Sequence, residues 1–537
     1  MAQQRITRAQ YIDMLWQLKH AFEQTRQQGI RFIHFNRMLK DETYRTEVIE
    51  QASQSDSPAL RAIAEQLLQV GFEGVLTASA SEAASVAFKT PEVERSATKK
   101  SMLIKPWHVG LGSVSVIAAA ALSVGFFDQS VSVSGNISGD KVWQSSKVYT
   151  LKDIIYVTPG STLTIEAGTT IKGESGSALV VANGARLQAT GSIESPIVFT
   201  SSQTPGSRAA GDWGGLVMLG DAPVNGGEDL IEGLNDQDGL SLYGGSDSSH
   251  NCGVLQYARI EFAGFEIGMG NELNGLTLGG CGDQTLISHV QIHRGLDDGL
   301  EIFGGTTSVS YILVTGAGDD MFDWDKGWQG NAQFLIGQQY HNLGDHGFEI
   351  DSNNEEPTLA PRTLPRVSNV TLISDRSEGK ANRAVSIDSG AGGDYRNILM
   401  LGFSGESIDL TTQATTRLLA SGQLSFDGLV AYDIGPNRNQ YFELETGEND
   451  DDGGFSERSY FTSLSDDVVF GENPYLLGNS TDQESPTYHP SFRSPVNLYG
   501  VNPPPGEFFE QGARYVGAVK PGADEAWYTG WSAFPIN

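Results

Sequence analysis

The chain has 537 residues, with 35 Lys and Arg against 66 Asp and Glu, which gives a net charge of −31 at pH 7. Residues 1–106 carry 14 basic and 12 acidic residues, so the rest of the chain carries 21 and 54. A surface this acidic repels nucleic acid and excludes a nucleic-acid-binding role. The 64 glycines follow no Gly-X-Y period, which excludes collagen.

Residues 1–73 have the pattern of a small helical bundle. Thr7 and Gln10 fit a capping box that opens a helix over residues 7–28, whose apolar residues fall on one face. Ser57, followed by Pro58, is the expected N-cap of a later helix. Three further helices are expected, at 31–40, at 43–53 and from Pro58 to Gly71.

This bundle contains no Cys/His metal spacing, P-loop or kinase signature. We therefore interpret it as a docking or assembly module. Residues 74–104, which follow it, are rich in Ala, Ser, Thr and Glu and show no clear periodicity. They are typical of a linker.

Residues 107–127 are uncharged throughout and match the roughly 20 apolar residues that a helix needs to span a bilayer. Lys99, Lys100 and Lys105 precede the run. Positive charge marks the cytoplasmic side of a membrane helix. The pattern predicts a transmembrane helix over 105–128, with the N-terminus in the cytoplasm.

A cleaved secretory signal is the alternative interpretation of this segment. It would start at Met102, use Lys105 as its basic region and be cut after residues 118–120, so that the mature chain begins near Ser123. The apolar run is long for a signal, and the residues before it read as capped helices. Both observations favour a retained anchor.

From residue 129 to residue 537 the sequence consists of short segments in which apolar and polar residues alternate, as in 161–173 and 178–189. Each segment ends at a Gly, Asn or Asp. Similar phrases recur every 20–26 residues, and no helix pattern interrupts them before the C-terminal tail. Periodic short strands without helices predict a mainly β protein, a parallel β-helix that buries each turn on its neighbours. At about 25 residues per turn we expect roughly 15 turns and a length of roughly 70 Å.

Four phrases carry a family resemblance: GDWGGL at 211–216, GDAPVN at 220–225, GDDMFDW at 318–324 and GWQGNAQF at 327–334. They resemble right-handed parallel β-helix (pectin-lyase-like) proteins found on surfaces or in envelopes of Gram-negative, often marine, bacteria. The resemblance covers most of the chain beyond residue 133. It implies the fold and an envelope location and carries no settled enzymatic role. A helical module and a membrane helix replace the lipid-anchored start of that family.

Acidic residues recur on what would be consecutive turns, and equivalent carboxylates would then stack about 4.8 Å apart. Ionised like charges at that distance need a cation, protons or neutralising neighbours, for which Lys326, Arg294 and His346 are candidates. Oxygen ligands from several loops suit Ca²⁺, and capping of turns by Asp is the alternative. The series also contains Asp325 and Glu349. The predicted metal ligands are Asp297, Asp298, Glu301, Asp319, Asp320, Asp323, Asp345 and Asp351.

Paired acids on neighbouring turns also occur in β-helix polygalacturonases and pectate lyases. The phrase Gly-Asp-His-Gly at 344–347 resembles the Gly-His-Gly of polygalacturonases, but an Asp interrupts it and no Arg-x-Lys follows. A pectate lyase also needs a basic residue beside Ca²⁺, and this region is poor in such residues. Trp213, Trp324 and Trp328 are candidates for stacking on sugars or for the core. We assign no catalytic residue.

The two cysteines, Cys252 and Cys281, lie on the exterior side of the predicted membrane helix, where we expect them to form a disulfide. Ser115, Ala119 and Ser123 form a small-residue face, from which self-association is expected.

The sequence thus predicts a single-pass protein of the bacterial inner membrane, with its β-helix in the periplasm or exterior. The acidic β-helix would act as a binding or scaffold module in a complex with protein partners of the membrane or envelope. A carbohydrate-active enzyme and a transmembrane signal relay are the two alternatives.

Overall fold

The structure is a computed structural model. The chain forms two compact units, Met1–Val124 and Gly125–Asn537. In the part of the chain that is described, no helix is long and apolar enough for a membrane span. The predicted linker, the transmembrane segment 105–128 and the predicted helix at 31–40 lie outside the described residues. The residues described are 4–5, 14–15, 18, 42–55, 57–71, 130–234, 238–268, 271–376, 382–444, 450–464 and 466–537.

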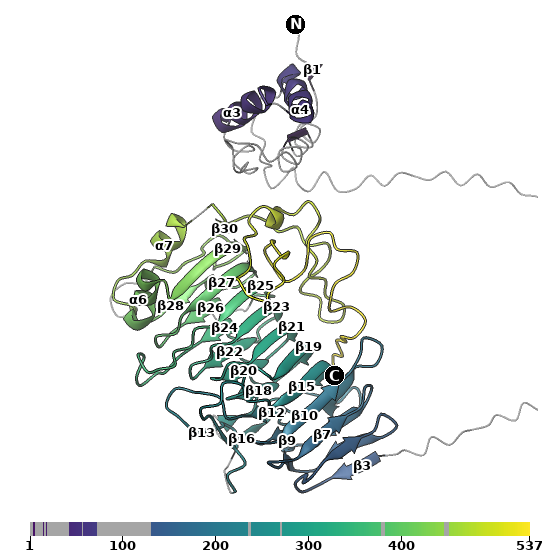
Figure 1. Ribbon diagram of the computed structural model, residues 1–537. Coiled ribbons are helices and arrows are strands. Elements are labelled where there is room, and N and C mark those ends of the chain that lie inside the picture. The colour runs from purple at the N-terminus through teal and green to yellow at the C-terminus, as the bar shows by residue number, and fades with distance from the viewer. Residues whose placement is uncertain are drawn as a thin grey trace, which may run out of the picture. The chain divides into compact units, whose positions relative to one another are not determined.

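In the N-terminal unit, the helices α3 (Glu42–Ser53) and α4 (Pro58–Gln69) pack against each other (Figure 1). The Ser57 hydroxyl accepts a hydrogen bond from the Leu60 N–H at 3.4 Å, so Ser57 caps α4 as the sequence predicts. The two helices bury one apolar face each, made of Val48, Ile49, Ala52, Leu60, Ala64 and Leu67.

Strand β2 (Val70–Gly71) directly follows α4 and pairs in parallel with β1 (Gln4–Arg5), a pairing that is not expected from the sequence. Of the predicted helix over residues 7–28, only residues 14–15 and 18 are described. These residues are helical, and Leu15 and Leu18 are fully buried.

The larger unit is a coil of two parallel sheets (Figure 1). Within the described residues, sheet 1 has 15 strands and sheet 2 has nine. Sheet 1 contains β3 (Ser130–Val133), β4 (Lys141–Trp143), β5 (Val148–Leu151), β7 (Thr162–Ile165), β8 (Thr170–Gly173), β10 (Arg186–Thr190), β11 (Ile197–Ser201), β15 (Gly253–Glu261), β19 (Leu286–His293), β21 (Ser308–Thr315), β23 (Asn331–Gln339), β25 (Arg366–Ser374), β27 (Gly393–Leu401), β29 (Leu424–Tyr432) and β30 (Val468–Phe470). Sheet 2 contains β6 (Ile154–Val157), β9 (Ala178–Val181), β12 (Leu216–Leu219), β18 (Leu276–Gly279), β20 (Leu300–Phe303), β22 (Phe322–Asp325), β24 (His346–Ile350), β26 (Arg383–Ile387) and β28 (Asp409–Leu410).

Small elements decorate the coil. Within the described residues, two antiparallel pairs lie outside both sheets, and three short helices follow sheet 2 in the chain. They are β13 (Asp229–Leu230) with β14 (Leu242–Tyr243), β16 (Glu266–Gly268) with β17 (Asn271–Glu272), α6 (Gln413–Ser421), α7 (Glu457–Ser463) and the 3-10 helix η2 (Pro495–Asn497).

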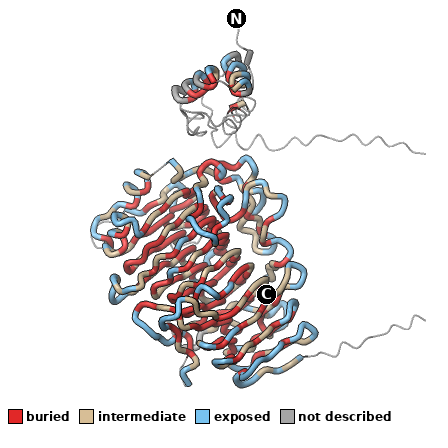
Figure 2. Tube along the Cα trace, in the orientation of Figure 1, coloured by how far each residue is buried: buried red, intermediate tan, exposed pale blue. Residues whose placement is uncertain are grey.

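The core forms because each turn places apolar side chains directly over those of the next. Leu300, Phe322 and Phe348 are paired in register and are fully buried. Alternate residues of a strand point to opposite faces, so the residue after each of these points outward. Burying one such side chain contributes roughly 1.5–3 kcal/mol. Figure 2 shows the buried residues running along the strands through the coil.

The coil is shorter than the roughly 15 turns expected. Strands β18 to β24 keep the predicted spacing, but insertions lengthen other turns, such as residues 220–252 between β12 and β15. The last strand, β30, ends at Phe470, and residues 471–537 run back along sheet 1 (Figure 1). The tail contributes no strand to either sheet, so the strands of the coil end at Phe470, whereas the sequence predicts a β-helix domain that extends to residue 537.

Polar side chains of sheet 1 hold this tail. The Asn369 side-chain amide donates to the Tyr515 carbonyl at 2.8 Å, and the Gln291 amide donates to the Ala533 carbonyl at 2.7 Å. Asn369 has a φ of 59°, a left-handed conformation that asparagine tolerates better than most residues. Backbone carbonyls of the tail thus accept hydrogen bonds from side chains of sheet 1.

Cys252 and Cys281 form a disulfide in the structure, with their Cα atoms 5.8 Å apart. Cys252 directly precedes β15, and Cys281 follows β18 on the next turn. The bond therefore ties the end of the 220–252 insertion to the regular coil.

Candidate metal centre on the nine-stranded sheet

The strands of sheet 2 bring one column of acidic residues to the outer face. Glu301 pairs in register with Asp323, and Asp323 pairs with Glu349. The residues on either side of each point into the core, so these three carboxylates point away from it. The spacing of neighbouring strands, about 4.8 Å, sets their separation.

A second column stands just before the strands and caps the backbone. The Asp298 carboxylate accepts the Asp320 N–H at 2.8 Å, and the Asp320 carboxylate accepts the His346 N–H at 2.5 Å. Asp298 is 8 % exposed and Asp320 is 1 % exposed. One oxygen of Asp298 and one of Asp320 therefore cap the backbone, as the alternative interpretation of the sequence expects.

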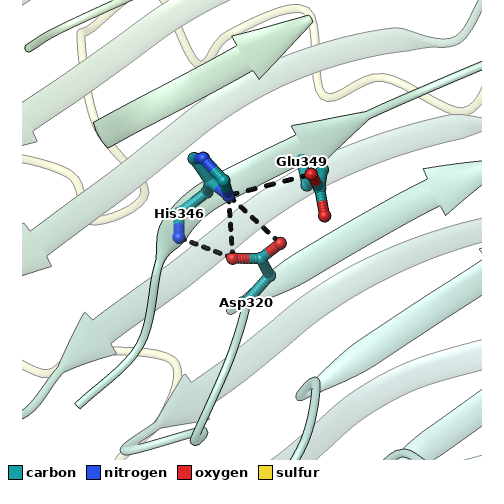
Figure 3. A group of neighbouring side chains, drawn as sticks. All are labelled: Asp320, His346 and Glu349. Atoms are coloured by element: carbon teal, nitrogen blue, oxygen red, sulfur yellow. Dashed lines mark hydrogen bonds and ion pairs between the residues drawn. The ribbon is translucent and has the colours of Figure 1, made fainter. Parts of the chain in front are cut away.

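We call these two columns of acidic residues together the ladder. At one end of the ladder a histidine compensates the negative charge. His346 Nδ1 lies 3.1 and 3.3 Å from the two oxygens of Asp320 and 4.0 Å from Glu349 Oε1 (Figure 3). We call Asp320, His346 and Glu349 the histidine group. All three offer atoms within 4.8 Å of one another. His346 Nε2 is buried without a hydrogen-bond partner.

The histidine group separates the charge states of its members. Burial alone would lower the pKa of His346, but the hydrogen bond and charge of Asp320 outweigh it and the pKa is raised. Burial likewise favours neutral Asp320, yet its bonds to His346 lower its pKa. Burial, then the hydrogen bond and charge of Asp320, raise the pKa of Glu349 to about 9. Asp320 is therefore ionised and Glu349 protonated at neutral pH.

Asp298, Glu301 and Asp323, which we call the carboxylate centre, have no such compensation. Their oxygen atoms lie within 4.8 Å of one another. Among the ion pairs of the described residues, none involves any of the three. Burial first, and then the neighbouring carboxylates, raise all three pKa values well above the ordinary range.

Two buried oxygen atoms at the carboxylate centre have no hydrogen-bond donor. They are Oδ1 of Asp323 and Oδ1 of Asn274. Asn274 is 1 % exposed, and its amide nitrogen donates to Glu301 Oε2. Buried acceptors are normally satisfied, because an unmade hydrogen bond costs about 1–3 kcal/mol. Carboxylate and amide oxygens drawn from adjacent turns are the donor set that Ca²⁺ takes.

The structure gathers six of the eight predicted metal ligands into clusters. Asp298 joins Glu301 and Asp323, and it also lies with Asp297 and Asp319; Asp320 belongs to the histidine group. Asp345 and Asp351 are in none of the clusters found among the described residues. Asp345 lies one turn beyond Asp319, and its N–H donates a hydrogen bond to the Asp319 carbonyl at 2.9 Å. Burial, then the charge of Glu272, raises the pKa of Asp297 to about 7.

Of the three residues predicted to neutralise the acids, His346 is the one that forms an ion pair with them among the described residues. Lys326 pairs with Asp229 at 3.4 Å, and Arg294 donates to Gln483. Sequence reasoning missed Arg383 as well as Asn274. Arg383 lies in register with His346 on the next turn.

Arg383 closes the far end of the ladder. Its guanidinium lies 3.3 Å from Glu406 and 3.0 Å from Asp409. Asp409 continues the outward column through Ser386. Positive charge is therefore supplied to the acids by His346 and Arg383 at the β24–β28 end of sheet 2, whereas no ion pair among the described residues involves the carboxylate centre.

A family model described as a pectate-lyase like beta helix domain matches residues 135–452. The chain belongs to this family. The match spans both sheets from β4 to β29 and includes every acidic residue of the ladder. No curated protein and no solved structure matches the chain.

Membership of this pectate-lyase-like family shows the fold, whereas the chemistry of the site has to be inferred from its residues. Trp213, Trp324 and Trp328 are all fully buried, so none of them can stack on a sugar. Arg383 is the basic residue in register with the ladder, and two carboxylates hold it. The geometry of the described site thus centres on buried oxygen ligands.

Proposed function

We propose that the β-helix binds Ca²⁺ at the carboxylate centre and acts as a binding and scaffold module of the bacterial envelope. The observation that carries this proposal is the unpartnered Oδ1 atoms of Asp323 and Asn274 beside three uncompensated carboxylates. Asp298, Glu301, Asp323 and Asn274 would hold the ion, which would neutralise their repulsion and link consecutive turns of sheet 2.

Calorimetric titration tests this proposal. Full-length protein treated with a chelator should bind about one Ca²⁺ per chain, and Asp323→Asn should weaken binding about tenfold or more because a charged ligand becomes a neutral one. Asp345→Asn removes an acid of the same ladder outside the clusters, and it should leave binding unchanged. Absence of Ca²⁺ binding, or equal loss in both variants, would refute the proposed site.

For the membrane we propose the topology that the sequence predicts. Residues 107–127 would anchor the chain in the inner membrane, residues 1–73 would dock to a protein partner in the cytoplasm, and the β-helix would lie outside. The basic residues Lys99, Lys100 and Lys105 support this orientation.

Protease added to spheroplasts should then digest or release the β-helix and leave residues 1–98 protected. Membranes opened by detergent provide the control, in which both parts become accessible. A mature chain that begins near Ser123 would show a cleaved signal instead and would refute the anchor.

A carbohydrate-active enzyme is the second candidate, and the histidine group favours it. Ionised Asp320 beside protonated Glu349 is the charge pattern of an acid–base pair. Glu349 is 42 % exposed and accessible to a substrate. The Asp320 side chain is only 1 % exposed and is not accessible to a substrate, which favours binding over catalysis.

Activity measurements on acidic and neutral polysaccharides would decide between the two candidates. An enzyme should lose at least about a hundredfold in turnover in Glu349→Gln, because general acid catalysis contributes roughly 10²–10⁴-fold. The Asp345→Asn variant should keep its activity. If no polysaccharide is cleaved by the native protein, or if Glu349→Gln keeps full activity, the enzymatic candidate fails.

A further inference from the structure

A second polar site lies where the strands of sheet 1 begin. It is a cavity of about 320 Å³. Strands β7, β10, β15 and β19 are hydrogen-bonded neighbours, and the cavity is lined by the residues that precede or open each of them. Its polar lining includes Arg186, Asp247, Ser249, His250, Asn251 and Gln284. It shares no residue with the carboxylate centre.

The wall formed by residues 247–251 is held in place from several directions. The His250 N–H donates to the Asp247 carbonyl at 2.9 Å, and the His250 carbonyl accepts the Gly282 N–H at 3.0 Å. The disulfide of Cys252 and Cys281 fixes the end of this wall to the next turn. A site held this way loses little conformational entropy on binding.

Several hydrogen-bonding groups of the cavity are not used within the protein. Arg186 makes no side-chain hydrogen bond or ion pair among the described residues, and neither does Gln284. His250 Nε2 is buried without a partner. In so acidic a domain, an uncommitted guanidinium is the group to which a carboxylate binds, through two parallel hydrogen bonds.

We propose that this cavity binds a small hydroxylated monocarboxylate, a sugar acid, whose carboxylate pairs with Arg186. Ser249, Asn251 and Gln284 offer hydroxyl and amide groups that match ring hydroxyls. Asp247 accepts from Ser249 and carries a negative charge that disfavours dianions such as phosphate monoesters. The volume lies at the small end of the range for ligand pockets, which suits a single ring.

Titration of the full-length protein with D-glucuronate tests the proposal. Saturable binding is expected, with D-glucose at least about tenfold weaker because it lacks the charge-assisted pair. Arg186→Gln should weaken glucuronate binding about tenfold or more, and Gln284→Ala roughly threefold. Arg493→Gln, the same exchange at an exposed arginine outside the cavity, should change nothing.

Each variant is compared with the native protein by thermal unfolding, so that loss of fold is not read as loss of binding. The proposal is overturned if glucuronate fails to saturate the native protein, if glucose or inorganic phosphate binds as well, or if Arg186→Gln binds normally. Titrations with and without Ca²⁺ should agree, because the carboxylate centre contributes no residue here. This keeps the test independent of the proposed metal function.

Discussion

Saturating Ca²⁺ should raise the unfolding temperature of the chelator-treated protein. A ligand that binds only the folded state at 100 times its dissociation constant stabilises that state by about 2.7 kcal/mol. The source of this energy is the carboxylate centre, where the oxygens of Asp298, Glu301 and Asp323 crowd within 4.8 Å without a counter-charge. Differential scanning calorimetry in chelator and in Ca²⁺ measures the difference. Mg²⁺, which demands smaller and more regular coordination, should give a smaller shift.

The Asp323→Asn variant makes this prediction sharper, because two effects of opposite sign are expected from one change. It removes an acid whose pKa is raised in the folded, metal-free centre. A carboxyl raised in this way costs stability at neutral pH, so the variant should unfold at a higher temperature than the native protein in chelator. It also removes a ligand, so the gain from Ca²⁺ should largely disappear. Asp345→Asn should keep the full gain. Identical native melting curves with and without Ca²⁺ would contradict the metal assignment.

Without metal, the protein should lose stability as the pH rises from 7 to 9. The folded-state pKa values of Asp297 and Asp351 are raised to about 7 and that of Glu349 to about 9, in each case first by burial. Unfolding returns them to about 4, so the folded state binds more protons in this window. The stability they contribute is complete below the unfolded pKa and is lost as pH passes the folded pKa.

The buried histidines His289 and His293 do not disturb this window. Burial lowers the pKa of His289 to about 4 and of His293 to about 3, so both are neutral in the folded and unfolded states above pH 7. Chemical denaturation at several pH values in chelator measures the slope. Constant or rising stability between pH 7 and 9 in chelator would show that these carboxyls are not protonated in the folded protein.

The fold and the acid ladder are predictable from the sequence because the repeat is local and regular there. The sequence motifs around Glu301, Asp323 and Glu349 recur at intervals of one turn, so equivalent residues of the motif pair in register on neighbouring strands. The apolar residues on either side fix which face each acid takes, since a slip of one residue would bury the charges. Sequence alone therefore places these side chains in one column.

The partners of the ladder are not predictable in this way. Arg383 lies in register with His346, but an insertion after β24 and the long strand β25 separate them in the chain, so no repeat connects them. Asn274 is a single neutral residue before β18 and stands out in no pattern. Asp351 matches the ladder in sequence, yet it follows β24 and lies beyond the clusters. Clustering depends on side-chain direction, which the letters do not give.

The most direct test of the account is to locate the ion. Crystals of the full-length protein grown with Ca²⁺, or soaked in a heavier trivalent analogue, should show an anomalous peak bounded by Asp298, Glu301 and Asp323, with metal–oxygen distances of about 2.3–2.6 Å for Ca²⁺. The Oδ1 atoms of Asp323 and Asn274 should then be among the ligands. A map without such a peak, in which the three side chains instead share hydrogen bonds as protonated acids, would contradict the central claim.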